Sequence, residues 1–152
     1  MANYCFNVLT IKAKKGNEAE LQRFINNFID KKGNARFEKI IPLPKGYFKG
    51  NLGKEEREKY GEKNWYDFNI ANYGTKWSPY KDSTHLSFND RKTIAWVGFD
   101  TAWSPCISFV ENASVKYPSL DFKLKYKEEG MCFKGTAHIV AGEILEDKCI
   151  NY

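Results

Sequence analysis

The segment Leu120–Lys127, with the sequence LDFKLKYK, alternates apolar and charged side chains more cleanly than any other part of the chain. Its apolar positions are Leu120, Phe122, Leu124 and Tyr126. Successive side chains of a β-strand point to opposite faces, so the pattern predicts a strand with one face buried and one face in water. Such one-sided strands are typical of antiparallel sheets that helices cover on a single face.

The N-terminal part of the chain predicts a strand followed by a helix. Residues 4–12 (YCFNVLTIK) are rich in β-branched and aromatic side chains. Apolar residues then recur at helical spacing, at Leu21, Phe24, Ile25, Phe28 and Ile29. Asn17 and Glu20 have the spacing of a capping box at the start of this helix. Residues 36–41 predict a second short strand, which Pro42 ends.

The second half of the chain repeats this order. Residues 84–89 and 93–99 predict a hairpin, and Ser104 with Pro105 marks the start of a second helix. The alternating strand follows, and a C-terminal hairpin is expected at about 131–150. We therefore predict one α+β domain over residues 1–152, a ferredoxin-like split βαβ sandwich with an antiparallel sheet and the helices on one face.

A helical insert at about 42–80 interrupts this plan before the central strands. It begins as a loop with several prolines and glycines and continues into a charged run, residues 54–63, that predicts a solvated helix. The following stretch, residues 65–77 (WYDFNIANYGTKW), concentrates aromatic side chains. These aromatics can either pack the insert onto the sheet or form an exposed surface for a ligand.

Composition excludes several classes of protein. The chain is 42% hydrophobic and 16% aromatic, which excludes a disordered protein. No apolar run approaches about 20 residues, so we expect no membrane association, and the N-terminus lacks the features of a signal peptide, which favours a cytoplasmic location. The four cysteines are scattered, so we expect reduced thiols and no metal. The net charge of +5 is a modest surplus, located in the first half of the chain.

Several motifs together resemble one protein family. They are MANYCFN (1–7), IIPLP (40–44), NYGTKW (72–77), FDTAWSP (99–105) and EEGMCFKG (128–135). The same motifs occur in this order and at similar positions in the YubB-like proteins, which the chain resembles. These proteins have a ferredoxin-like domain and occur mostly on plasmids, phages and other mobile elements. Tyr4, Tyr73 and Cys106 depart mildly from that family's pattern. The resemblance implies a fold and a genomic setting, but the family has no established activity and supplies no catalytic residues.

The two aromatic motifs supply the candidate binding site. Its residues are Trp65, Tyr66, Tyr73, Lys76, Trp77, Asp100, Thr101, Trp103 and Ser104. Backbone N–H groups around Ser104 would favour an anion if they lie at a helix N-terminus. The alternative is that Ser104 only caps the helix and that the aromatic residues only fill gaps. The two motifs form one site if they meet in an open cleft, and they are core if they are buried side by side; we place any specific function where they meet.

Three functions are compatible with these residues. The first is a non-enzymatic binding module, an adaptor or an inhibitor from a mobile element, with a protein as partner. The second is single-stranded nucleic-acid binding through the sheet, with aromatic and lysine candidates at Tyr4, Phe6, Trp96, Lys12, Lys92 and Lys123–Lys127. The third is a small-molecule or nucleotide-processing enzyme with a pocket between the insert and the second helix, using Asp67, Lys76, Asp100, Thr101 and Ser104.

The supply of catalytic groups is poor. The two histidines, His85 and His138, each stand alone in a predicted strand, and no phosphate-binding or nucleophile motif is present. We therefore expect no cofactor, and the sequence favours a binding protein over an enzyme without excluding the enzyme.

Overall fold

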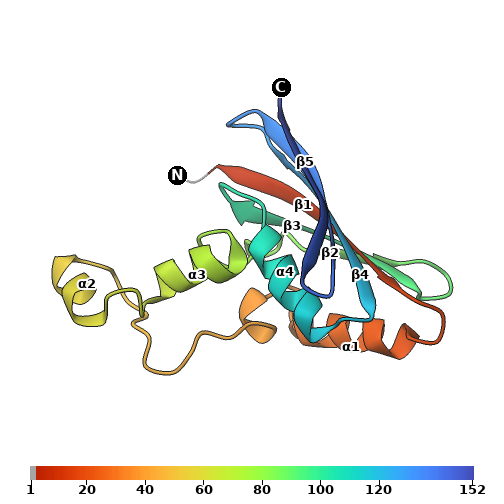
Figure 1. The fold of residues 1–152 in the computed structure, drawn as a ribbon, viewed down its shortest axis with the longest axis horizontal. Helices are drawn as coiled ribbons and strands as arrows, with labels where there is room; N and C mark the ends of the chain where they lie inside the picture. The colour runs from red at the N-terminus through yellow and green to blue at the C-terminus, as the bar shows by residue number, and fades with distance from the viewer. Residues whose placement is uncertain (1–2) are drawn as a thin grey trace.

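Six antiparallel strands form one sheet in the computed structural model, which describes residues 3–152 (Figure 1). The strands are β1 (Tyr4–Ala13), β2 (His85–Phe88), β3 (Ile94–Ala102), β4 (Leu120–Glu128), β5 (Phe133–Val140) and β6 (Glu143–Asn151). Their order across the sheet is β2-β3-β1-β4-β5-β6. The C-terminal pair β5–β6 thus extends the sheet beyond β4, and β1 lies between β3 and β4.

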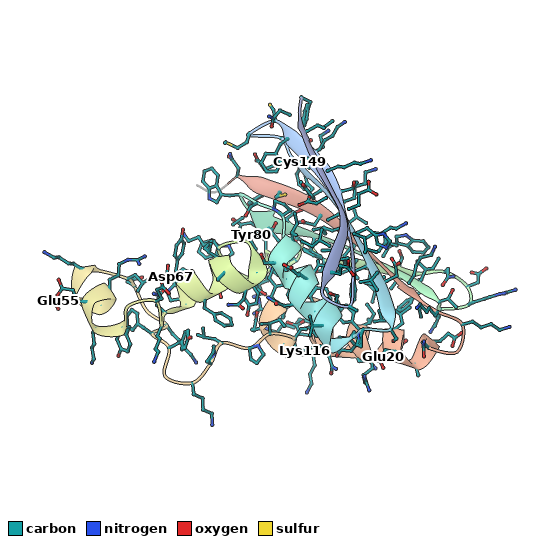
Figure 2. All side chains as sticks on the ribbon, viewed as in Figure 1. Glu20, Glu55, Asp67, Tyr80, Lys116 and Cys149 are labelled. Carbon is teal, nitrogen blue, oxygen red and sulfur yellow. The ribbon has the colours of Figure 1, made fainter. Side chains whose placement is uncertain are left out.

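Helices cover one face of this sheet. They are α1 (Glu18–Phe28), α2 (Lys54–Tyr60), α3 (Trp65–Tyr73) and α4 (Ile107–Lys116), together with a short 3-10 helix, η1 (Phe37–Lys39). In Figure 1, α1 and α4 lie against the sheet, whereas α3 and α2 extend away from it. Figure 2 shows the same arrangement through its labelled side chains, with Glu55 and Asp67 far from the sheet. The predicted α+β class and antiparallel sheet are confirmed.

A cluster of phenylalanines joins the helices to the sheet. Phe28 of α1 stacks on Phe109 of α4 with ring centroids 5.3 Å apart, and meets Phe99 of β3 edge-on at 6.0 Å. Phe37 of η1 also stacks on Phe109, at 4.3 Å, and lies 6.3 Å from Phe28. All these rings are buried, so α1, α4 and η1 share one core on the same face of the sheet.

The strand predicted at residues 36–41 is wrong. Only Ala35 makes an isolated bridge, to Ile29, and the chain then turns through η1. Phe37 and Ile40 are both buried and stand three residues apart, which is the spacing of a 3-10 turn and not of a strand. Burial of these two side chains therefore determines the local conformation.

Two predicted helix starts also differ in detail. Asn17 occupies the cap position of α1, but its side chain makes no capping hydrogen bond. Glu20 instead pairs with Arg23 at 2.6 Å, so the predicted capping box is wrong. The second predicted helix begins at Ile107, with Cys106 at the cap position, because Ser104 is used in another contact.

Candidate functional site

The face of the sheet opposite the helices is open. On β1 the alternate residues Cys5, Leu9 and Ile11 are buried under the helices, so the residues between them point to the other face. Large apolar side chains remain exposed there: Tyr4 (51%), Phe6 (42%), Val8 (43%) and Trp96 (36%). This surface, which we call the open face, carries the aromatic candidates predicted for nucleic-acid binding.

Lysines occupy the neighbouring half of the open face. Lys123, Lys125 and Lys127 are the exposed alternate residues of β4. Strand pairing adds two more lysines. Lys134 of β5 lies opposite Lys127. Lys148 of β6 lies in the same row as Lys125, because both pair with Thr136 of β5. The sheet thereby gathers lysines that are far apart in the sequence.

A shallow hollow of about 670 Å³ joins these lysines to the aromatic residues. It is lined by Phe6, Val8, Lys125, Tyr126, Lys127, Lys134, Gly135, Thr136, Lys148 and Ile150. None of these lining residues is acidic. We call this hollow the lysine pocket. It combines apolar surface with positive charge, which suits a ligand that has both aromatic rings and several negative charges.

Two of the lysines of the pocket have an acidic neighbour outside it. Lys127 Nζ lies 3.9 Å from Glu129, and Lys148 Nζ lies 3.1 Å from Glu146. Within residues 3–152, Lys125 and Lys134 have no carboxylate within ion-pair distance. The ring of Tyr152 also lies between Lys127 and Lys134, with centroid distances of 5.3 and 5.5 Å. The lysine pocket therefore keeps a net positive charge.

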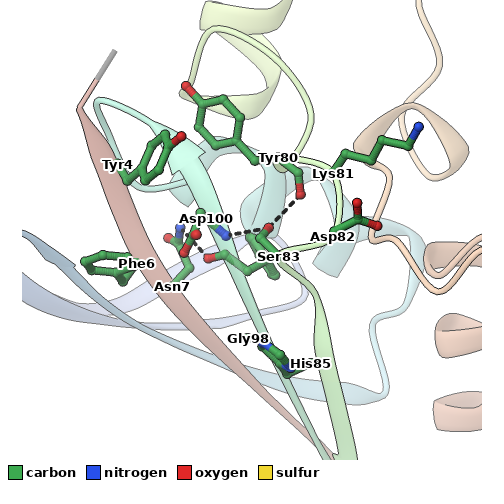
Figure 3. Close-up of a pocket in the computed structure, with 11 residues that line it drawn as sticks. Tyr4, Phe6, Asn7, Tyr80, Lys81, Asp82, Ser83, His85, Gly98 and Asp100 are labelled. Atoms are coloured by element: carbon green, nitrogen blue, oxygen red, sulfur yellow. Dashed lines mark hydrogen bonds between the residues drawn. The ribbon is translucent and has the colours of Figure 1, made fainter. Parts of the chain in front are cut away.

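A second hollow, of about 530 Å³, lies at the other end of the open face (Figure 3). The rings of Tyr4 and Tyr80 form one wall, with centroids 4.7 Å apart, and Asp100 lies beneath them. Gly98 and His85 line its other end. Phe6 lines both hollows, so this one, which we call the tyrosine pocket, adjoins the lysine pocket.

Hydrogen bonds fix the floor of the tyrosine pocket. The backbone N–H of Tyr80 donates to the carbonyl of Asp100 at 2.9 Å, and the N–H of Asp100 donates to Ser83 Oγ at 3.1 Å. Ser83 Oγ in turn donates to the carbonyl of Tyr80 at 2.6 Å. Partial burial raises the pKa of Asp100 above its usual range, and the nearby His85 opposes this only in part. The backbone of Asp100 is thus fixed, and its carboxyl group is partly desolvated.

The aromatic wall continues onto the insert. Trp77 meets Tyr80 edge-on at 6.3 Å, and Lys76 Nζ lies 4.4 Å from the centre of the Trp77 ring, a cation–π contact. Trp77 is 38% exposed. Of the predicted site residues, Asp100 lines the tyrosine pocket and Trp77 contacts its wall through Tyr80, which the sequence did not single out; Lys76 lies against Trp77.

Other predicted site residues join the insert to the sheet and α4. Ser104 Oγ donates to the carbonyl of Gly74 at 2.6 Å, and Thr75 Oγ1 donates to the carbonyl of Ala102 at 2.7 Å. Thr101 Oγ1 donates to the carbonyl of Ser104 at 2.6 Å. The motifs NYGTKW and FDTAWSP thus meet, as a set of internal hydrogen bonds that we call the docking seam.

The remaining predicted residues are divided between core and surface. Tyr73 is buried against Phe37 and donates to the carbonyl of Ile41 at 2.5 Å. Trp65 and Tyr66 lie on the outlying helix α3, where the Trp65 indole N–H donates to the carbonyl of Gly50. Trp103 is 46% exposed just after the end of β3 and adopts a positive φ of 67°. The nine candidates therefore do not form one site.

The polar set suggested for an enzyme is also dispersed. Asp67 accepts from Asn64 and pairs with Arg57 on the insert, and it does not line the tyrosine pocket. Thr101 is buried; its hydroxyl donates within the docking seam and accepts from Asn7 Nδ2 of β1, and Ser104 donates within the seam. Within residues 3–152 there is no group of three or more potential metal ligands, and no helix is long and apolar enough to cross a membrane.

Comparison with known proteins supports the fold. Residues 85–152 match a family model described as "Ferredoxin-like domain in Api92-like protein". The crystal structure of a protein Api92 from Yersinia pseudotuberculosis is similar over 100% of this chain and 98% of that chain, with a TM-score of 0.63 and 8% sequence identity. No curated protein matches the chain. The fold is therefore ferredoxin-like, as predicted, and resembles that of Api92.

Proposed function

We propose that this protein is a non-enzymatic binding module that binds single-stranded nucleic acid on its open face. The observation that carries the proposal is one row across the sheet, in which Asp100, Phe6, Lys127 and Lys134 stand opposite one another on β3, β1, β4 and β5. Strands lie about 4.8 Å apart, so this row spans about 14 Å. Bases stack on aromatic rings while phosphates contact lysines, and the row presents both in sequence.

The first test is the salt dependence of binding. Four lysines line the lysine pocket, and the slope of log K against log salt for a single strand is about −0.7 per neutralised phosphate, so a slope of about −3 is expected. The measurement is fluorescence anisotropy of a labelled oligothymidine of about 12 nucleotides, titrated over a range of salt concentrations. Absence of binding at low salt, or binding that ignores salt, would contradict the proposal.

A matched pair of variants separates location from net charge. The triple variant Lys125→Ala, Lys127→Ala, Lys134→Ala removes three lysines from the pocket and should reduce the slope to about −0.7. The control variant replaces three exposed lysines of the insert, Lys45, Lys49 and Lys63, by alanine. Its net charge is the same as that of the pocket variant. Equal weakening by both variants would show only general charge attraction and would refute the open face as the site.

Stacking is tested at Phe6, which lines both hollows. Removing a stacked ring costs about 1–3 kcal/mol per base, so Phe6→Ala should weaken binding about tenfold or more. Because this side chain is half exposed on the open face, its loss should leave the core and the unfolding midpoint nearly unchanged. Unchanged affinity would remove aromatic stacking from the proposal.

A protein partner is the second candidate, as adaptor or inhibitor. It is favoured by the exposed Trp77 and Trp103, since such side chains are frequent anchors of protein interfaces. A partner captured by the wild type, lost by Trp103→Ala and independent of oligonucleotide would support it.

The biological setting belongs to the same proposal. The resemblance to YubB-like proteins supports a cytoplasmic protein of a plasmid, phage or other mobile element, where single strands arise during transfer and replication. The order β2-β3-β1-β4 supports the split βαβ interpretation of the core, in which the central strands present the binding face.

A further inference from the structure

Asp100 is an acidic side chain at one end of a face otherwise rich in lysine. If the open face binds nucleic acid, as proposed above, a carboxylate there repels phosphates and needs another role. It lies opposite Phe6 in the strand register, beside the paired rings of Tyr4 and Tyr80. If the phosphates of a nucleic-acid strand contact the lysines, one of its bases can reach the hollow beside Asp100.

The carboxylate of Asp100 is available for a ligand. Within residues 3–152, no side chain or backbone N–H donates a hydrogen bond to it and no cation lies within ion-pair distance. Its own backbone is held by Tyr80 and Ser83, so the side chain starts from a fixed point on the wall of the hollow. Gly98, two residues before Asp100 on β3, adds no side chain to the same hollow and leaves room at the end away from the tyrosine rings.

We propose that the tyrosine pocket binds a guanine base, with the Asp100 carboxylate accepting hydrogen bonds from its ring N1–H and its exocyclic amino group. Guanine presents two adjacent donors that match the two oxygens of a carboxylate. Adenine and cytosine offer one amino group beside an acceptor nitrogen, and thymine or uracil offers one N–H between two carbonyls that repel the carboxylate. The rings of Tyr4, Tyr80 and Phe6 provide the stacking surface.

The test compares oligothymidines that differ at one central position. Anisotropy competition at one salt concentration gives the affinity of the strand carrying a single guanine relative to the all-thymine strand and to strands with one adenine or cytosine. A bidentate contact discriminates by about 1–3 kcal/mol, so the guanine strand should bind about tenfold more tightly than the all-thymine strand.

Two variants locate the preference. Asp100→Asn keeps the shape but replaces one acceptor with a donor, so it should abolish the preference for guanine while binding the all-thymine strand at least as tightly as before. Gly98→Val narrows the hollow and should also remove the preference; a Cβ at Gly98 meets its nearest atoms at 3.8 Å or more, an ordinary contact, and the unfolding midpoint of the variant checks that it folds. Asp90→Asn, an equal charge change in the exposed β2–β3 turn, is the control.

The outcomes separate this inference from the proposed function. Equal affinity for all four strands, or a guanine preference that survives in Asp100→Asn, overturns the guanine pocket alone. Failure of every strand to bind in a salt-dependent way overturns both the pocket and the open face as a nucleic-acid site. A preference lost in Asp100→Asn and Gly98→Val but kept in Asp90→Asn supports the pocket.

Discussion

Replacing Gly74 by alanine tests whether the docking seam contributes to stability. Gly74 ends α3 in the left-handed conformation, with φ 80°. A Cβ there would lie 3.3 Å from both the Pro105 carbonyl oxygen and the Ser108 backbone nitrogen. The left-handed conformation costs an alanine about 1 kcal/mol or more, and the tight contact with the start of α4 adds to it, so we expect a loss of about 2–3 kcal/mol.

Gly33 provides the matched control. Its φ is 83°, but a Cβ there meets nothing within 4 Å, so Gly33→Ala measures the conformational cost alone, about 1 kcal/mol. At about 2–4 °C per kcal/mol, the melting temperature should fall by about 3 °C for Gly33→Ala and about 8 °C for Gly74→Ala. The assay is thermal unfolding followed by circular dichroism. Equal losses in the two variants would refute the conclusion that the seam is tightly packed.

Three further predictions concern single groups. Thr75→Val removes the hydroxyl that donates to Ala102 and should lower the free energy of unfolding in urea by about 1 kcal/mol, without changing oligonucleotide affinity. Burial raises the pKa of Asp100 in the folded state, so stability should rise as pH falls through that pKa; the urea midpoint of Asp100→Asn should lack this rise. A thiol reagent should modify two cysteines in the native protein, the exposed Cys132 and Cys149. After unfolding it should modify all four, because Cys5 and Cys106 are buried in the fold.

The sheet was predictable where one face meets water and the other meets the core. The alternation at Leu120–Lys127 identified β4 because the buried and exposed residues follow the period of a strand without interruption. Residues 36–41 carry a similar content of apolar side chains, but Phe37 and Ile40 are buried three apart. Whether a short segment buries every second residue, as a strand does, or every third, as a 3-10 turn does, depends on where the core lies. A segment of six residues does not show where the core lies.

The motif residues were misleading as a site for a different reason. A serine, a threonine and a glycine can either hold two segments of the chain together or bind a ligand. The sequence motif does not distinguish these two roles. In the structure Ser104 and Thr75 donate to carbonyls across the docking seam, with Gly74 at the close approach. The two motifs do meet, and the result of their meeting is the attachment of the insert to the sheet and α4.

The complete lysine pocket and the tyrosine pocket depend on contacts between distant parts of the chain. Lys134 reaches Lys127 through strand pairing, and Tyr80 reaches Tyr4 across the end of the insert. The alternating lysines of β4 and the expected C-terminal hairpin were the available signals, since a hairpin places the next strand beside β4. The register that sets Lys134 opposite Lys127 follows from the turn geometry, which the sequence pattern alone did not specify.

The open face requires an explanation other than solubility. Lysines on exposed strands commonly prevent sheets from aggregating, and the alternating lysines of β4 alone could have that role. A face shaped only for solubility would not also expose Tyr4, Phe6, Val8 and Trp96 beside those lysines. The insert could have covered them, yet α3 docks on α4 and leaves the face open. Exposed rings and cations on one face, with a carboxylate at the end of the row, fit a surface that binds a strand of bases and phosphates.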